Sequence, residues 1–140
     1  MTPTKIDLQK PPKFLEILGS KGFQFDDELN TSLMTFVISK DLTHSNGTIV
    51  QGGFITAMLD AAMSHALFGT DDTISGVASL DIATQFIGVC RGQQPLRVSG
   101  RVKRATFKTA FLEADIHDQE GTLLATAQSV AKLSRQSADA

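Results

Sequence analysis

The longest run of apolar positions in the chain extends over residues 51–69 and predicts one long helix. Apolar side chains recur on nearly every side of this helix, without the charged stripe of a surface helix. Two glycines, Gly52 and Gly53, open the run, and its single carboxylate, Asp60, lies about two turns further on. Burying an ionised carboxylate without a partner costs several kcal/mol. We therefore expect Asp60 to take part in the protein's chemistry.

Beyond residue 70 the pattern changes to alternation of apolar and polar positions, which is typical of half-buried strands. Four alternating stretches follow one another, joined by short connections. They predict an antiparallel meander with one dry face, which the apolar helix covers. The apolar positions of the four strands are Ala78, Leu80, Ile82 and Phe86; Leu96, Val98 and Val102; Ala110, Leu112, Ala114 and Ile116; and Leu123, Ala125, Ala127, Ala131 and Leu133.

Three shorter segments precede the apolar helix. Prolines at the start and Gly19 at the end predict a short helix over about residues 11–19. Alternation from Thr31 to Lys40 predicts a strand, and residues 41–50 form a polar loop that leads into the helix. We expect one domain over residues 1–140, with its core at about residues 30–134. Its class is α+β: an antiparallel sheet wrapped around one long central helix, which is the hot-dog architecture.

Composition narrows the classes of function. A formal charge of -2 argues against a protein that coats nucleic acid, and the absence of Trp and Tyr removes two of the aromatic residue types on which single strands stack. A single cysteine, Cys90, excludes an intrachain disulfide and a Cys-based zinc site, and the three histidines lack metal-ligand spacing, so we expect no metal. No apolar run reaches the ~18 residues of a membrane span, and the N-terminal residues lack the features of a secretory signal. We expect a cytoplasmic protein that does not bind membranes.

The all-round apolar character of the helix also predicts self-association. One side packs on the sheet, so its other side is expected to meet a second subunit. Pairing of edge strands across a twofold axis would remove exposed hydrogen-bonding edges at the same time. The expected assembly is a homodimer at least, and a homotetramer is our prediction.

The loop and the start of the helix contain one recognisable pattern: Asn46-Gly47-Thr48, then Gln51-Gly52-Gly53, then Asp60, eight positions after Gly52. This pattern resembles the signature of a known family, the PaaI-like hot-dog acyl-CoA thioesterases of the phenylacetate-pathway type, with the spacing from Gly52 to Asp60 preserved. Two departures stand out: Gln51 replaces the family's usual His, and the Asn lies one residue closer to the glycine pair than in the most common spacing. Ser64 matches a hydroxyl common in the family, and Ser79 resembles the serine of a Ser-x-Asp strand that closes the site from the other subunit. The resemblance covers about residues 30–134.

These residue types suit thioester hydrolysis. A backbone N–H of Gly52 or Gly53 at the helix N-terminus can stabilise the oxyanion that forms when the carbonyl is attacked. Asp60 of the partner subunit is then expected to activate water as a general base or to attack as a nucleophile, with CoA thiolate leaving. Ser64 and Ser79 would position the water or the carboxylate. The resemblance implies an acyl-CoA substrate, and no separate cofactor is expected.

A basic segment follows the first of the four strands. Residues 91–108 contain six Lys and Arg side chains and no acid, which creates a local positive field suited to phosphates. The pyrophosphate and 3′-phosphate of CoA are the expected ligands of four of them: Arg101, Lys103, Arg104 and Lys108.

Two other readings of the sequence stay open. A non-catalytic protein that binds or senses acyl-CoA would use Asp60 only as a structural residue and would release no thiol. A hot-dog dehydratase or hydratase would need a catalytic His paired with a carboxylate in an early loop, a context that His44 lacks.

Overall fold

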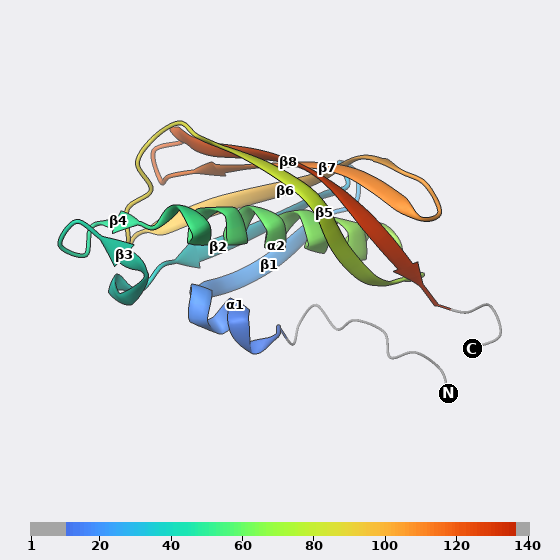
Figure 1. Cartoon of the computed structure of the whole chain (residues 1–140), viewed down its shortest axis with the longest axis horizontal. Helices are drawn as coiled ribbons and strands as arrows, with labels where there is room; N and C mark the ends of the chain where they lie inside the picture. Colours follow the sequence, from blue (N-terminus) through green and yellow to red (C-terminus); the bar gives the residue numbers. More distant parts are fainter. Residues whose placement is uncertain (1–10, 137–140) are drawn as a thin grey trace.

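A six-stranded antiparallel sheet curves around one long helix (Figure 1). The computed structural model describes residues 11–136. The strand order of the sheet is β1-β2-β6-β7-β8-β5, and β3 and β4 form a separate pair. This arrangement confirms the predicted α+β hot-dog class. The elements are α1 (Lys13–Leu18), β1 (Ser20–Asp26), β2 (Thr31–Val37), the 3-10 helix η1 (Lys40–Leu42), β3 (Thr43–His44), β4 (Ile49–Val50), α2 (Gly52–Thr70), β5 (Ile74–Phe86), β6 (Pro95–Ala105), β7 (Thr109–His117) and β8 (Leu123–Arg135).

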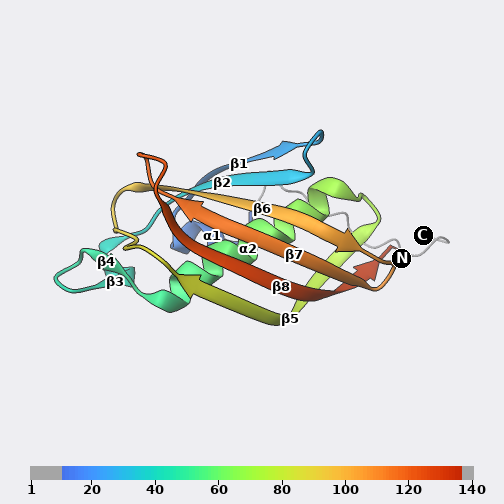
Figure 2. The same ribbon diagram turned by 90° about the horizontal axis from the view of Figure 1, so that it is seen from above.

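The helix α2 lies close against the concave face of the sheet (Figure 2). A Cβ atom on Gly100 of β6 would lie 2.3 Å from the carbonyl oxygen of Ala62, so only glycine permits this approach. The same carbonyl accepts a hydrogen bond of 2.6 Å from Ser32 Oγ on β2. Met58, Leu59 and other side chains between the two layers have no exposed surface. The middle of α2 is therefore fixed against β2 and β6.

The predicted meander of four strands is wrong at one connection. Strands β6, β7 and β8 do pair in chain order, but β5 pairs with β8 and forms the edge of the sheet. Residues 87–94 lead from β5 to β6 across the end of the fold, where the Cys90 carbonyl accepts a hydrogen bond of 2.9 Å from Val50 N–H. Alternation identifies strands and their faces but does not specify which strands are neighbours.

The predicted apolar face of β5 is also wrong in part. The register between β5 and β8 shifts between Ser79 and Asp81, which marks a β-bulge. A bulge places an extra residue in one strand and exchanges the two faces beyond it. Ala78 and Leu80, predicted to be buried, are exposed, Leu80 by 64%, whereas Ile82 beyond the bulge packs against the core as predicted. Ser79, predicted on the polar face, points instead to α2, where its hydroxyl meets Asp60.

Two regions contain strands that the sequence pattern did not predict. Gly19, with φ of 88°, ends α1 and turns the chain into β1, which pairs with β2. The segment expected to be a polar loop, residues 41–50, contains the short β3–β4 hairpin. Ser45, Asn46 and Gly47 in its turn all have positive φ, a conformation that favours Asn and Gly. The hairpin lies beyond the N-terminus of α2, at the left of Figure 1.

Candidate active site

The N-terminus of α2 is capped by a side chain from its own chain. Gln51 is the N-cap residue, and its Oε1 accepts a hydrogen bond of 2.7 Å from Gly53 N–H. The Gln51 carbonyl accepts from Phe54 N–H at 3.0 Å and from Ile55 N–H at 3.3 Å. A Cβ on Gly53 would lie 2.9 Å from that Oε1, so the cap depends on glycine there. Within residues 11–136, nothing accepts a hydrogen bond from Gly52 N–H.

An aromatic ring lies close to Gly52 and its free N–H. A Cβ on Gly52 would lie 3.4 Å from two ring atoms of Phe86, and Phe54 is half-buried beside it. The first turns of α2 are joined to β5 by a contact of 3.0 Å between the hydroxyls of Thr56 and Thr84. A polarising donor at a helix N-terminus next to an apolar wall suits an acyl group with a carbonyl at its end.

Asp60 lies on the side of α2 that faces β5. Its Oδ1 accepts a hydrogen bond of 2.7 Å from Ser79 Oγ. The two residues therefore meet within one chain, whereas the resemblance implied that the Ser79 strand closes the site from the other subunit. Asp60 is half-buried in the single chain rather than fully buried, and Asp81 is exposed. The serine leaves the second oxygen of Asp60 available to water or substrate.

Neighbouring side chains on α2 divide between two sides of the helix. Ser64 is half-buried one turn after Asp60, without a hydrogen bond to it. His65 is 8% exposed and points the other way: its Nδ1 donates to the Ala61 carbonyl at 2.9 Å, and its ring packs edge-on against Phe23 at 4.9 Å between centroids. Burial lowers the pKa of His65, so its imidazole is neutral at pH 7. It is a core residue.

The remaining candidates lie apart from one another. Gly52 and Asp60 are eight positions apart on one helix, which corresponds to about 12 Å along its axis. A single chain therefore cannot present both to the same carbonyl. Asn46 is exposed in the β3–β4 turn and makes no hydrogen bond with Gly52 or Asp60. The structure thus joins Gln51 to Gly53 and Asp60 to Ser79, but does not bring these two pairs together.

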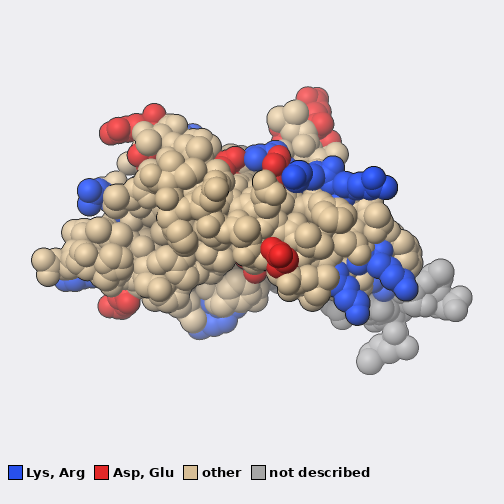
Figure 3. Space-filling view, turned by 45° about the horizontal axis from the view of Figure 1, so that its top comes forward, with Lys and Arg blue, Asp and Glu red and all other residues tan. Residues whose placement is uncertain are grey.

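The four basic candidates differ in their surroundings. Arg101 is committed to two carboxylates of β7, with Nε 3.1 Å from Glu113 Oε1 and Nη1 3.1 Å from Asp115 Oδ2. The other three, Lys103, Arg104 and Lys108, are exposed and form no ion pair with any described residue. Figure 3 shows Lys and Arg side chains gathered at the right-hand end, where Figure 1 places the β6–β7 turn.

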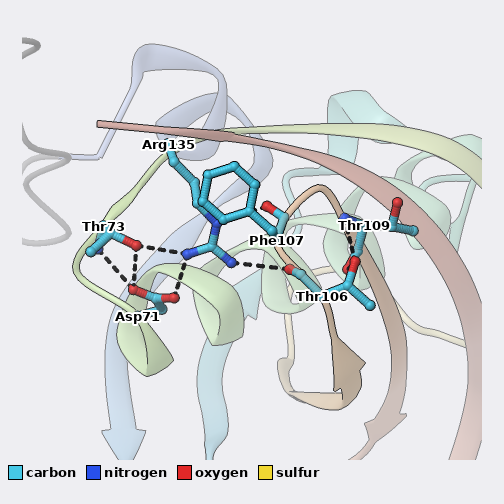
Figure 4. Close-up of polar contacts among 6 residues, drawn as sticks. All are labelled: Asp71, Thr73, Thr106, Phe107, Thr109 and Arg135. Atoms are coloured by element: carbon cyan, nitrogen blue, oxygen red, sulfur yellow. Dashed lines mark hydrogen bonds and ion pairs between the residues drawn. The ribbon is translucent and has the colours of Figure 1, made fainter. Parts of the chain in front are cut away.

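One polar cluster was missed by the sequence analysis. Arg135, at the end of β8, donates from Nη1 to Asp71 Oδ2 at 2.6 Å and to Thr73 Oγ1 at 2.7 Å (Figure 4). It also binds the carbonyls of Phe107 at 2.7 Å and Thr106 at 3.1 Å. Hydrogen bonds from Arg135 and Thr73 lower the pKa of Asp71 to about 2. Asp71 and Arg135 are 64 positions apart, so no local pattern could have paired them.

Two further properties of the described residues bear on function. No helix within residues 11–136 is both long and apolar enough to cross a bilayer. In the same range, no three His, Cys, Asp or Glu side chains are grouped so that they could hold a metal ion.

Comparison with known proteins adds a family and several similar structures. Residues 47–125 match the family model described as "Thioesterase superfamily". No match was found among curated proteins. A putative thioesterase, a phenylacetic acid degradation-related protein from Ralstonia eutropha JMP134, is 22% identical with a TM-score of 0.78, and the match covers 88% of this chain and 91% of that one.

Two other solved structures share the fold. The PaaI protein from the phenylacetic acid degradation operon of E. coli is 12% identical with a TM-score of 0.67, and the match covers 75% of this chain and 73% of that one. A hypothetical thioesterase from Streptococcus pneumoniae TIGR4, solved with coenzyme A, is 14% identical with a TM-score of 0.72, and the match covers 82% of this chain and 86% of that one.

Proposed function

Because the chain belongs to the thioesterase superfamily, we propose that it hydrolyses acyl-CoA thioesters to free CoA and a carboxylic acid, at sites shared between two subunits. The resemblance to PaaI-like hot-dog thioesterases is confirmed, and with it the class of enzyme, a hydrolase acting on thioesters. One observation carries the proposal: α2 holds a free N–H at Gly52 and the Asp60–Ser79 pair about 12 Å apart. The CoA present in the Streptococcus pneumoniae structure supports the choice of thiol.

A twofold dimer would bring the two halves of the site together. In an antiparallel pair of α2 helices, Gly52 of each subunit lies opposite Asp60 of the other. The surface required for such a pair is present, because β5 has an unpaired outer edge and exposed apolar side chains follow it. Association of two dimers into a homotetramer stays a prediction. The exposed apolar residues along this edge are Leu80, Phe86, Ile87 and Val89.

Gly52 is the donor to the developing oxyanion in this mechanism. Gly53 N–H already binds Gln51 Oε1, whereas Gly52 N–H is uncommitted and benefits from the helix dipole. Since an N–H must donate to an oxygen, the contact also fixes the orientation of the Gln51 amide and leaves its Nε2 as a second donor. Gln51 cannot exchange protons as the family's usual His could. It therefore acts here by holding the helix terminus.

Asp60 supplies the attack on the carbonyl carbon. Either Asp60 takes a proton from a water molecule whose oxygen adds to the carbon, or its own oxygen adds and water later releases the acid. In both routes the C–S bond breaks and CoA leaves as the thiolate. Ser79 holds one carboxylate oxygen, so that the other faces the substrate. Ser64, one turn along the same face, is placed to bind the water, and Asn46 would reach the site only from the partner subunit.

The phosphates of CoA bind at the basic end of the sheet in this proposal. Lys103, Arg104 and Lys108 are available, whereas Arg101 is neutralised by Glu113 and Asp115 and is not part of the proposed phosphate site. A cytoplasmic location belongs to the same proposal, because CoA thioesters occur inside cells.

A thiol-release assay tests the proposal. Short, medium, long and aryl acyl-CoAs are offered to the wild-type protein and to Asp60→Asn. We expect at least one substrate to be hydrolysed and the variant to lose about 100-fold or more in kcat, the magnitude typical of acid–base groups. Asp27→Asn, which changes an exposed carboxylate in the turn after β1, is the matched control and should keep full activity.

Two outcomes would contradict this assignment. Tight acyl-CoA binding without thiol release would favour a binding or sensing protein. Full activity of a folded Asp60→Asn variant would remove Asp60 from the mechanism.

A further inference from the structure

Phe107 is an exposed aromatic residue on an ordered turn. It lies between β6 and β7, and 70% of its surface is accessible. Thr106 and Thr109 close the turn: Thr106 N–H donates to the Thr109 carbonyl at 2.7 Å, and Thr109 N–H donates to Thr106 Oγ1 at 3.1 Å. A large apolar side chain is thus presented to solvent on a hydrogen-bonded support.

Arg135 covers one face of this ring and leaves the other face open. Its guanidinium carbon lies 5.1 Å from the ring centroid, within the range of a cation–π contact (Figure 4). Two of its nitrogens bind the carbonyls of Phe107 and Thr106, and a third binds Asp71. Because ring and turn are already held in place, a ligand that stacks on the open face has little ordering entropy to overcome.

The cations around the turn are not neutralised. Lys103, Arg104 and Lys108 form no ion pair with residues in the described range 11–136, whereas Arg135 is paired with Asp71. An open aromatic face beside uncompensated positive charge suits a ligand with a flat base and several phosphates.

The position of the turn relative to Asp60 identifies such a ligand. Asp71, which binds Arg135, lies eleven positions after Asp60, about 16 Å along α2. In an acyl-CoA the pantetheine arm and pyrophosphate separate the thioester from the adenine. A thioester at Asp60 can therefore place its nucleotide at the β6–β7 turn.

We propose that Phe107 is the stacking platform for the adenine of CoA, with Lys103, Arg104 and Lys108 binding the adjoining phosphates. Arg135 is a positioning residue that completes a stack of guanidinium, phenyl ring and base. The inference rests on the proposed hydrolysis of acyl-CoA and adds the residues that recognise the nucleotide. Base–aromatic stacking contributes about 1–3 kcal/mol, which corresponds to about 5- to 150-fold in affinity.

A tryptophan at this position reports binding directly, because the chain has no Trp of its own. The fluorescence of Phe107→Trp should be quenched by CoA and by adenosine 3′,5′-bisphosphate, but not by pantetheine. Phe107→Ala should raise the KM for acyl-CoA by about 5- to 150-fold with kcat unchanged. It should leave hydrolysis of the matching acyl-pantetheine unaffected. Phe14→Ala, which removes another exposed phenyl ring from α1, is the control and should change neither KM.

The outcomes separate this inference from the proposed hydrolysis. If wild-type protein hydrolyses no acyl-CoA but Phe107→Trp is quenched by CoA, the platform stands and the hydrolysis fails. If acyl-CoA is hydrolysed and Phe107→Ala has the wild-type KM, the platform fails. A response of Phe107→Trp to phosphatidylglycerol vesicles but not to the bisphosphate would overturn the inference in favour of a membrane-binding surface.

Discussion

The two ends of α2 are built in opposite ways. At its N-terminus a neutral amide, Gln51, binds Gly53 N–H and leaves Gly52 N–H without a partner in the described chain. At its C-terminus Asp71 donates its own N–H to the Leu67 carbonyl at 3.1 Å, while its carboxylate accepts from Arg135 and Thr73. One end has an N–H without a hydrogen bond, whereas the carboxylate at the other end accepts hydrogen bonds from two residues.

This difference indicates that the N-terminus of α2 can take part in chemistry, whereas its C-terminus supports the fold. Helix termini leave backbone groups that something must satisfy. An N–H left free next to apolar side chains is ready for a ligand oxygen, whereas a terminus already bound by side chains can only hold its neighbours in position. We therefore expect changes at the N-terminus to affect turnover first, and changes at the C-terminus to affect stability first.

The largest effect is expected from Gly52→Pro. Gly52 is the first helical residue, where proline is tolerated, and Gln51 has the extended backbone that precedes proline readily, with ψ of 139°. The substitution removes the free N–H while keeping the helix. Loss of one oxyanion donor lowers kcat by about 100- to 1,000-fold. Gly52→Ala keeps the N–H and places a Cβ 3.4 Å from Phe86, so it should retain most of the activity.

Mixing inactive variants tests whether the N-terminus of one subunit serves Asp60 of another. In dimers formed from equal amounts of Gly52→Pro and Asp60→Asn, each mixed dimer has one intact shared site. The mixture should recover about a quarter of the wild-type activity, since half of the dimers are mixed and each has one of two sites. No recovery after verified subunit exchange would place both residues of a site in one chain.

A smaller effect is expected from the coupling between Gln51 and Gly53. Gln51→Ala removes the cap and should lower the free energy of unfolding by about 1 kcal/mol. Gly53→Ala alone displaces the amide, because its Cβ would lie 2.9 Å from Oε1, and should be neutral or destabilising. In the Gln51→Ala background the same change should stabilise by up to about 1 kcal/mol, since alanine favours helix over glycine. Equal effects of Gly53→Ala in the two backgrounds, measured by urea unfolding, would show that Gln51 and Gly53 are not coupled.

The smallest effect on turnover is expected at the C-terminus. Asp71→Asn should lower the free energy of unfolding at pH 7 by about 1 kcal/mol, allowing for solvent screening of a side chain that is 36% exposed. Its kcat should change less than twofold. Because the pKa of Asp71 falls to about 2 on folding, wild-type protein keeps this stabilisation above about pH 4 and loses it as the pH falls through 2.

Unfolding curves at pH 7, 4 and 2 check this dependence on pH. The difference between wild-type protein and Asp71→Asn should shrink towards pH 2. Asp27→Asn, a change at an exposed acid in the turn after β1, should show no such trend. A difference that stays constant with pH would contradict the role given to the Asp71 carboxylate.

The sequence predicted the elements correctly where a hydrophobic pattern continued over many residues. The apolar run predicted α2, and the alternation of apolar and polar residues predicted β6, β7 and β8. Both patterns are local, because the burial of side chains determines which neighbouring positions are apolar. It failed where partners come from distant parts of the chain. The place of β5 next to β8 depends on how residues 87–94 cross the fold, and the bulge after Ser79 exchanges the faces of that strand.

In the candidate site, too, local features of the sequence were predicted, whereas features that depend on side-chain contacts were not. The spacing from Gly52 to Asp60 was visible in the sequence and singled out both residues. The choice between Gly52 and Gly53 was not visible, because it depends on where the Gln51 side chain points. Nor could the contact between Ser79 and Asp60 in one chain be foreseen, since strict alternation turns Ser79 away from the helix.

The close approach of Gly100 to the Ala62 carbonyl gives the proposed catalytic centre a fixed depth in the fold. Ala62 follows Asp60 by two residues. Its carbonyl accepts a hydrogen bond from Ser32 and lies so close to Gly100 of β6 that no side chain fits between them. Any side chain at position 100 would push the helix away from the sheet and carry the Asp60 carboxylate with it. The strand behind the helix thus sets how far Asp60 projects, although it contributes no atom to the chemistry.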